Sequence, residues 1–230
     1  MKSLTLIIGI IRVIMILCVD RTKQVMAFPA TSTTTTTTTP AATLLSLQQL
    51  QNISSRLVSD SRNICQRFER DRLEGLVSRG QRCQDPVQTV TPLSPLTLLF
   101  LSKQSILETL EVNLLRFVEP LHDMTVRETS WPGLHIFYMP YNGQRGFEDL
   151  ENDVTVLLND VKARIRLLEP STVPVIPRTI ISEVTYNPAS TAAVDTDRAN
   201  HLLLRTLVTF SRQVRSLTIT YVRKEFEAPS

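Results

Sequence analysis

The sequence is poor in glycine, with six glycines among 230 residues, and it contains a single tryptophan. Turn-rich β proteins use many glycines, because glycine reaches positive φ angles at little steric cost. The scarcity therefore favours long helices over a turn-rich β fold. Residues 176–185 are rich in side chains that favour strands, but no other segment offers an obvious partner strand.

Catalytic and metal-binding motifs are also missing. The sequence holds no G-x-S-x-G, no phosphate-binding loop and no H-E-x-x-H. Its histidines, His122, His135 and His201, are scattered, and none has a second ligand at the spacing of a metal site. We therefore expect a protein that is not an enzyme and that needs no metal or other cofactor.

Basic residues are in excess only near the start of the chain. Residues 1–27 carry four basic side chains and Asp20, a net charge of +3, which equals the formal net charge of the whole chain. The remaining chain is therefore formally neutral. We expect no nucleic-acid partner, because the chain after residue 27 has no excess of basic residues that could bind a phosphate backbone.

Residues 1–27 have the composition of a secretory signal peptide. A lysine precedes a mostly apolar run, and Val25 and Ala27 are small residues at positions −3 and −1 of a cleavage site before Phe28. The alternative is a membrane anchor, but the run is short for a span and contains Arg12. No second apolar run is long enough to cross a bilayer, so we expect a secreted, extracellular protein whose mature form is not membrane-inserted.

Cysteine use agrees with export. Cys18 lies in the leader, so cleavage leaves Cys65 and Cys83. An even count in an oxidising compartment predicts one disulfide, which would stabilise the fold by roughly 3 kcal/mol in the chain-entropy model. The alternative is a pair of free thiols.

Residues 28–42 are dominated by a threonine run beside proline, which cannot build a core. In a secreted protein such a segment is typical of a disordered stalk, with or without O-linked glycans. Asn52-Ile53-Ser54 is an N-glycosylation sequon, usable only where Asn52 points outward. The folded domain is then residues 43–227.

Four segments of this domain have the apolar periodicity of long helices. They are residues 43–76, 95–118 and 147–169, and a last helix that begins near Asp195 or Thr196 and runs to about residue 226. Ser94 and Pro95 form a typical helix start, and Pro120 is expected to end the second helix. The buried side of that second helix is predicted at Leu99, Ile106, Leu110, Leu114 and Phe117.

The last helix has an apolar stripe at steps of three and four residues. The stripe consists of Leu203, Leu207, Phe210, Val214, Leu217 and Tyr221. Arg198, Arg205 and Arg212 fall on the opposite side and should face water or a partner. Such a helix cannot bury its stripe alone, so it predicts a bundle.

The lengths of the links indicate the topology. Residues 77–94 and 170–194 are both long enough to run the length of a bundle. A bridge between Cys65 and Cys83 would fold the first link back along the first helix, so the second helix would start at the same pole. We therefore predict an all-α four-helix bundle with up-up-down-down topology. The link at 121–146 is also long, which this topology does not require.

A leader, four amphipathic helices, a cysteine pair and a last helix reading LLLRTLVTFSRQVRSLTITYVRK together resemble the long-chain helical cytokines. The similarity is to the interleukin-6 type, which includes interleukin-11 and the ciliary neurotrophic factor and cardiotrophin branch. It covers most of residues 43–227 and rests on helix pattern and order. Members of this family are ligands of class I cytokine receptor chains, commonly including a shared signalling subunit, and they trigger Janus kinase and STAT signalling.

The resemblance implies three receptor-binding surfaces. The first joins the end of the first link to the C-terminal part of the last helix, with Arg212, Arg215, Arg223 and Lys224. The second uses exposed residues of the first and third helices, such as Arg67, Arg70, Asp153 and Lys162. The third lies where the last helix begins and would include Trp131. The Phe-x-x-Lys motif of some members is missing at residues 197–201, which leaves the co-receptor open.

Less specific alternatives stand beside these assignments. The arginines of the last helix could form a solvated face, and Trp131 could pack on its own bundle. The alternative function is a secreted helical carrier of lipid or apolar ligands, of the apolipoprotein type. A carrier should open its apolar stripes to lipid, whereas a cytokine should be a rigid, cooperative monomer.

Overall fold

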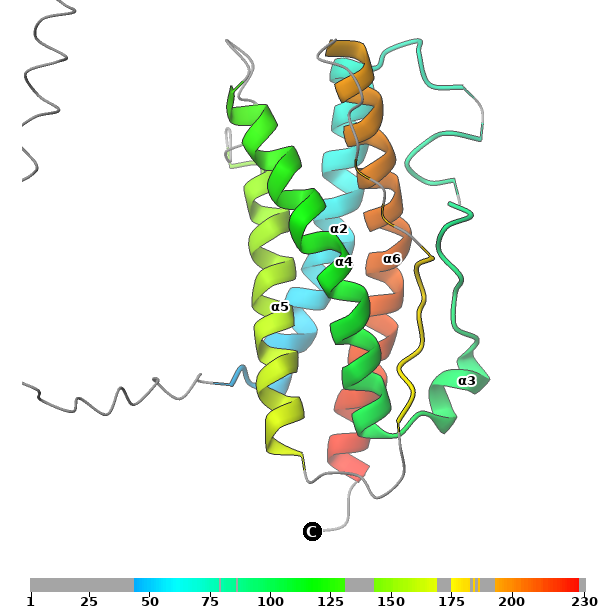
Figure 1. Ribbon diagram of the computed structural model, residues 1–230, viewed down its shortest axis with the longest axis vertical. Helices are drawn as coiled ribbons and strands as arrows, with labels where there is room; N and C mark the ends of the chain where they lie inside the picture. The colour runs from blue at the N-terminus through cyan, green and yellow to red at the C-terminus, as the bar shows by residue number, and fades with distance from the viewer. Residues whose placement is uncertain are drawn as a thin grey trace, which may run out of the picture. The chain divides into compact units, whose positions relative to one another are not determined.

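The structure is a computed structural model that describes residues 44–78, 80–85, 87–130, 143–168, 175–182, 184, 186 and 193–227. Its helices are α2 (Leu47–Arg72), α3 (Pro95–Phe100), α4 (Lys103–Ser130), α5 (Phe147–Leu167) and α6 (Ala193–Glu227). Four long helices lie side by side, and the short α3 lies outside them against α6 (Figure 1). The described part of the chain is therefore all-α and contains no strand. The leader, the threonine run and Trp131 lie outside the described residues.

A capping box starts α2. The Ser46 hydroxyl accepts a hydrogen bond from the backbone N–H of Gln49 at 3.1 Å, and the Gln49 side chain accepts from the backbone N–H of Ser46 at 2.8 Å. The helix ends at Arg72, so it is shorter at both ends than the predicted 43–76. Ser54 and Ser61 lie on the buried side of α2 and are fully buried, and Ser61 Oγ lies 3.2 Å from Ser211 Oγ of α6.

The predicted second helix is two helices. Ser94 caps α3 as expected, with its hydroxyl accepting from the backbone N–H of Thr97 at 3.1 Å. The chain then breaks before α4, and this break leaves Leu99 exposed rather than buried. The prediction that Pro120 ends the helix is wrong, because α4 continues through it to Ser130.

Burial on both sides of Pro120 explains the continuation of α4. A proline inside a helix removes one backbone hydrogen bond, at a cost of about 3 kcal/mol. Phe117, Leu121 and Met124 are fully buried around it, and each such side chain stabilises the helix by about 1.5–3 kcal/mol. The packing gained by extending the helix therefore exceeds the cost of the proline.

The apolar stripes meet in one core between the four long helices. All six stripe residues of α6 are buried, as predicted. Phe117 of α4 and Phe210 of α6 stack with ring centroids 4.9 Å apart, and Phe68 of α2 packs against Phe147 of α5 at 5.9 Å. Helix α6 begins at Ala193, so Asp195 and Thr196 lie in its first turn rather than before it.

Ion pairs join the ends of three long helices at one pole of the bundle. Arg72 at the end of α2 lies 2.7 Å from the Glu128 carboxylate near the end of α4. The same guanidinium lies 3.3 Å from the Asp197 carboxylate in the first turns of α6. The ends of α2 and α4 therefore meet the start of α6.

Contacts at the other pole join the opposite ends. Lys103 at the start of α4 lies 3.2 Å from the Glu225 carboxylate at the end of α6. The backbone N–H of Leu45, just before α2, donates to the Asp160 carboxylate near the end of α5 at 2.8 Å. The starts of α2 and α4 thus lie beside the ends of α5 and α6.

The first and third links touch each other. Val90 and Ile181 form an isolated antiparallel bridge, with Thr91 N–H donating to the Ile180 carbonyl at 2.8 Å. The Asn113 side chain of α4 accepts from the backbone N–H of Ile180 at 2.8 Å and so fixes this segment on the bundle. The strand-like residues of the third link therefore do have a short partner, which the sequence did not reveal.

Candidate functional site

The first link presents α3 to solvent along the C-terminal part of α6. The backbone N–H of Leu93 donates to the Gln213 side chain at 3.0 Å, and Lys224 Nζ donates to the Leu99 carbonyl at 3.1 Å. Gln213 and Lys224 are eleven residues apart, three turns of helix, so they lie on the same side of α6. These contacts and the packing of Leu98 against the core hold α3 in place, and Leu96, Leu99 and Phe100 remain exposed.

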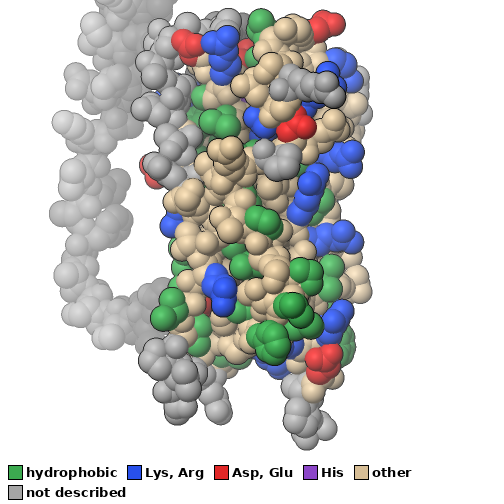
Figure 2. Space-filling view, turned by 90° about the vertical axis from the view of Figure 1, so that its right-hand side faces the viewer, with side chains coloured by type: hydrophobic (Ala, Val, Ile, Leu, Met, Phe, Trp, Pro, Cys, Tyr) green, Lys and Arg blue, Asp and Glu red, His purple; other side chains and the backbone are tan. Residues whose placement is uncertain are grey.

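An apolar patch results on the outside of the bundle. Leu96, Leu99 and Phe100 of α3 are 68%, 53% and 86% exposed. Green side chains gather low on the face that carries this part of the chain (Figure 2). We call Leu96, Leu99, Phe100, Arg212 and Arg223 the α3–α6 surface. Exposed groups of apolar residues rimmed by polar ones are typical of sites that bind other proteins.

Basic side chains flank this patch on α6. Arg212, Arg215 and Arg223 are exposed, as predicted, and Lys224 is half-buried by its contact with α3. Arg212 and Arg223 are again three turns apart and share one side of the helix. Arg215 faces a groove of about 600 Å³ against α2, which it lines together with Arg62. The sequence did not single out Arg62, because its neighbour on α6 depends on the packing of the two helices.

Arg205 is not part of this exposed set, which corrects the expectation that it faces water or a partner. Its guanidinium is buried and donates to the carbonyls of Gly80 and Arg82, both at 3.1 Å. The first link folds over this turn of α6 and uses Arg205 to satisfy its own backbone. The side of α6 opposite the core is therefore exposed only at the turns that the first link does not cover.

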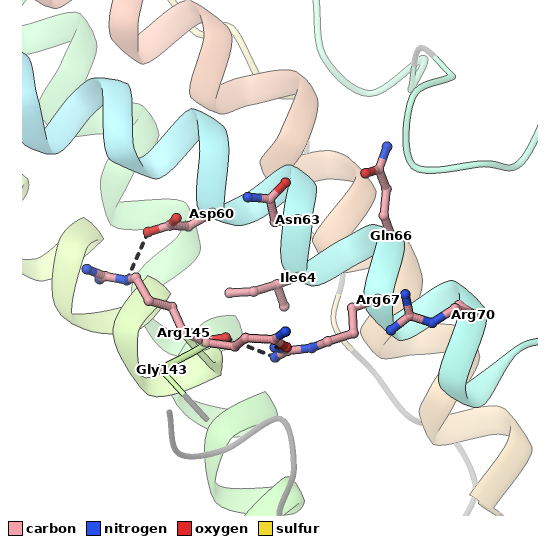
Figure 3. Close-up of a pocket in the computed structure, with 9 residues that line it drawn as sticks. Asp60, Asn63, Ile64, Gln66, Arg67, Arg70, Gly143 and Arg145 are labelled. Atoms are coloured by element: carbon pink, nitrogen blue, oxygen red, sulfur yellow. Dashed lines mark hydrogen bonds and ion pairs between the residues drawn. The ribbon is translucent and has the colours of Figure 1, made fainter. Parts of the chain in front are cut away.

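A second candidate surface is a pocket of about 540 Å³ between α2 and the segment that leads into α5. Arg67 and Arg70 reach toward it from α2, and Gly143 and Arg145 line its other side (Figure 3). Arg67 donates to the Arg145 carbonyl at 2.9 Å, and Arg145 lies 2.8 Å from the Asp60 carboxylate. Burial lowers the pKa of Arg67. The pocket is lined mainly by cationic and amide groups and would suit an acidic side chain of a partner.

Asp153 does not belong to an exposed face, contrary to expectation. Its side chain is 4% exposed and lies 3.0 Å from Arg145, and it also pairs with Arg56 of α2. Burial raises the pKa of the neighbouring Asp60, and the charge of Arg145 opposes this. These ion pairs tie the start of α5 to α2 and are structural.

A third group surrounds the cysteines. Cys65 of α2 and Cys83 of the first link form a disulfide with Cα atoms 5.9 Å apart. His201 Nε2 lies 3.8 Å from Cys83 Sγ and 2.8 Å from Glu69 Oε1. Burial lowers the pKa of His201, and the hydrogen bond with Glu69 opposes this. Four potential ligand atoms, from Cys65, Glu69, Cys83 and His201, lie within 4.8 Å of one another, a proximity that spacing along the sequence does not reveal.

The remaining features concern modification, membranes and relatives. Asn52 is exposed on α2, and its side chain accepts from Gln48 Nε2 at 2.9 Å, so the sequon points outward. Among the described residues, no helix has the length and apolarity that crossing a membrane requires. Comparisons with models of known protein families, with curated proteins and with solved structures found no match to this chain.

Proposed function

We propose that the protein is a secreted helical cytokine that binds class I cytokine receptor chains, including a shared signalling subunit, and brings them together to trigger Janus kinase and STAT signalling. The observation that carries the proposal is the α3–α6 surface. It is an apolar patch rimmed by arginines, in the region where the resemblance implies the first receptor-binding surface. The signal-like leader supports secretion, and the absence of a catalytic motif in the sequence supports a binding role.

The proposal includes up-up-down-down topology. Two contacts support it: Arg72 lies between the ends of α2 and α4 and the start of α6, and Lys103 joins the start of α4 to the end of α6. Helices α2 and α4 then run in one direction, and α5 and α6 run in the other. The two long links would each run along the bundle, as this topology requires.

The composition of the α3–α6 surface suits a stable protein interface. Interfaces commonly have an apolar centre with aromatic anchors and a polar rim, and arginine is enriched in them. Phe100 would be the anchor, and Arg212 and Arg223 would pair with acidic residues of the receptor. Charge complementarity of this kind speeds association and selects partners.

The pocket between α2 and α5 would bind a second receptor chain. Its lining residues come from α2 and residues 143–145, whereas the α3–α6 surface is formed by α3 and α6, so the two surfaces share no residue and two chains could be engaged together. This is the bridging step that brings the receptor-associated kinases together. The carrier alternative would instead need the apolar stripes to open, and these stripes bury one another in the core.

The proposal is tested by binding of the secreted protein to a panel of class I cytokine receptor ectodomains. Leu96→Asp/Phe100→Asp and Arg212→Glu/Arg223→Glu should each weaken binding about 30-fold or more, the effect of losing about 2 kcal/mol at an interface. Arg166→Glu, which changes an exposed arginine of α5, should bind like the wild type. Binding to no ectodomain, together with binding to lipid vesicles, would replace this proposal with the carrier.

A further inference from the structure

We propose that reduction of the Cys65–Cys83 disulfide creates a Zn²⁺ site in which Cys65, Cys83, His201 and Glu69 are the ligands. The inference does not depend on the proposed function. It concerns the pole where the first link crosses α2 and α6, away from the α3–α6 surface. The disulfide in the oxidised protein and the zinc ion in the reduced protein would each join the first link to the helices at this pole, α2 and α6.

The ligand types fit zinc. Structural zinc sites use four ligands drawn from cysteine thiolate, histidine nitrogen and carboxylate oxygen. Two thiolates, one imidazole and one carboxylate meet that requirement, and thiolates select zinc over magnesium or calcium. Within the described residues, this group is the one set of such side chains whose ligand atoms converge.

The spacing also fits zinc. Bond lengths of about 2.3 Å to sulfur and 2.0 Å to nitrogen place the ligand atoms of a tetrahedral site roughly 3.3–3.8 Å apart. Cys83 Sγ and His201 Nε2 are already 3.8 Å apart, and Glu69 Oε1 lies 2.8 Å from the same nitrogen. Two changes are required: the two sulfur atoms separate once their bond is broken, and the 2.8 Å hydrogen bond between His201 Nε2 and Glu69 Oε1 opens as the proton of that nitrogen moves to the other ring nitrogen. Rotation of the cysteine side chains about their Cα–Cβ bonds separates the sulfur atoms.

Local structure already orients the ligands. Cys65 and Glu69 are four residues apart on α2, so they project from the same side of the helix. The backbone N–H of Cys83 donates to Glu69 Oε1, which fixes that carboxylate beside the cysteine. Such a contact is the kind of supporting interaction that orients a metal ligand.

The group is buried but can be reached. Cys65, Cys83 and His201 are buried, which favours a dry and well-defined coordination site. A pocket of about 410 Å³ is lined by Leu73, Leu202 and Arg205 and by His201 itself. The pocket reaches His201 but is not lined by Cys65 or Cys83, so an ion can approach the histidine from it, and a reductant needs a local opening of the first link to reach the sulfurs.

The chemistry balances with a small thiol as reductant. One thiolate attacks a sulfur of the disulfide and forms a mixed disulfide, and a second thiolate releases the protein sulfur. The products are two cysteine thiols and one small-molecule disulfide. Zn²⁺ then displaces both thiol protons to solvent, and neutral His201 and ionised Glu69 complete the site. Thiol–disulfide exchange with the same small-molecule disulfide, which is reduced to two small thiols, would re-form the protein disulfide and release the ion.

The test uses protein purified with its disulfide intact and then reduced by a phosphine, which becomes the phosphine oxide by taking oxygen from water. After removal of the phosphine without air, Co²⁺ and then Zn²⁺ are titrated into reduced and unreduced protein. The reduced form should bind one Co²⁺ with the absorption of a tetrahedral thiolate site, and one equivalent of Zn²⁺ should displace it. The unreduced form should bind neither ion in this way.

Two variants separate a built site from two free thiols. His201→Gln and Glu69→Gln keep both cysteines and should weaken Zn²⁺ binding at least tenfold. His122→Gln changes an exposed histidine on α4 and should bind like the wild type. Circular dichroism follows folding, and any helicity lost on reduction should return with Zn²⁺. No tetrahedral Co²⁺ spectrum, equal affinity in the His201→Gln variant, or helicity that Zn²⁺ does not restore would each overturn the proposal.

Discussion

Arg72 is a buried charge with two acidic partners. Its side chain is 8% exposed and pairs with Glu128 and Asp197, which come from two other helices. Removal of one partner from a buried ion pair commonly costs 3–5 kcal/mol, because the remaining charges are left unpaired. We expect Arg72→Ala to lower the free energy of unfolding by about that amount, measured by urea denaturation at neutral pH.

Arg70 provides the matched control for this change. It lies half a turn before Arg72 on the same helix, but its side chain is 71% exposed and pairs with Asp71. Exposed pairs of this kind contribute little to stability, because water screens the two charges. Equal losses in Arg70→Ala and Arg72→Ala would show that burial of Arg72 is unimportant for stability.

Asp197 should make stability depend on pH. Burial raises its pKa above the ordinary value of 3.8, and Arg72 opposes this. The folded state therefore holds this proton more tightly than the unfolded state does. Its contribution to stability is complete below the ordinary pKa and is lost as the pH rises through the raised pKa of the folded state.

The substitution Asp197→Asn removes this titration. The stability of the variant relative to the wild type should therefore rise as the pH increases from 3.8 through the raised pKa of the folded state, as measured by denaturation at each pH. Asp195→Asn, at an exposed position two residues earlier, should show no such trend. A difference between Asp197→Asn and wild type that is constant over this range would contradict the assigned cause.

At the scale of a helix, Pro120 sits inside α4 at the cost of a backbone hydrogen bond. Pro120→Ala restores a backbone N–H donor at residue 120, which should stabilise α4. Without proline the unfolded chain has more conformational freedom, and this offsets part of that stabilisation. We expect the free energy of unfolding to rise by about 2 kcal/mol in urea denaturation. A fall would mean that contacts of the proline ring outweigh the missing hydrogen bond.

Periodicity predicted the long helices well where burial is one-sided. The stripe of α6 is buried as expected, because a step of three and four residues maps directly onto one side of a helix. The end of α4 was not predictable from Pro120, since packing by residues far away in the sequence decides whether a helix tolerates a proline. The exposure of α3 was not predicted, for a similar reason. Its apolar residues fit the buried side of one continuous helix, and only the break at residues 101–102 in the structure separates them from it.

At the scale of the molecule, the candidate sites depend on which helices and links become neighbours. The helix pattern predicted exposure of Arg198, Arg205 and Arg212, and Arg198 and Arg212 are exposed, but Arg205 is buried because a link covers it. The approach of His201 to the cysteines joins segments more than 100 residues apart. No local pattern in the sequence predicts this contact, because it arises from the packing of α6 against α2.

The central claim is that one molecule engages two receptor chains through separate surfaces. It is tested most directly by capturing one ectodomain, adding the secreted protein, and then measuring binding of a second ectodomain to the complex. Leu96→Asp/Phe100→Asp should abolish capture, whereas Arg70→Glu, in the pocket between α2 and residues 143–145, should leave capture intact and weaken the second binding step. A second ectodomain that never binds, or that binds equally to wild type and Arg70→Glu, would contradict the bridging account.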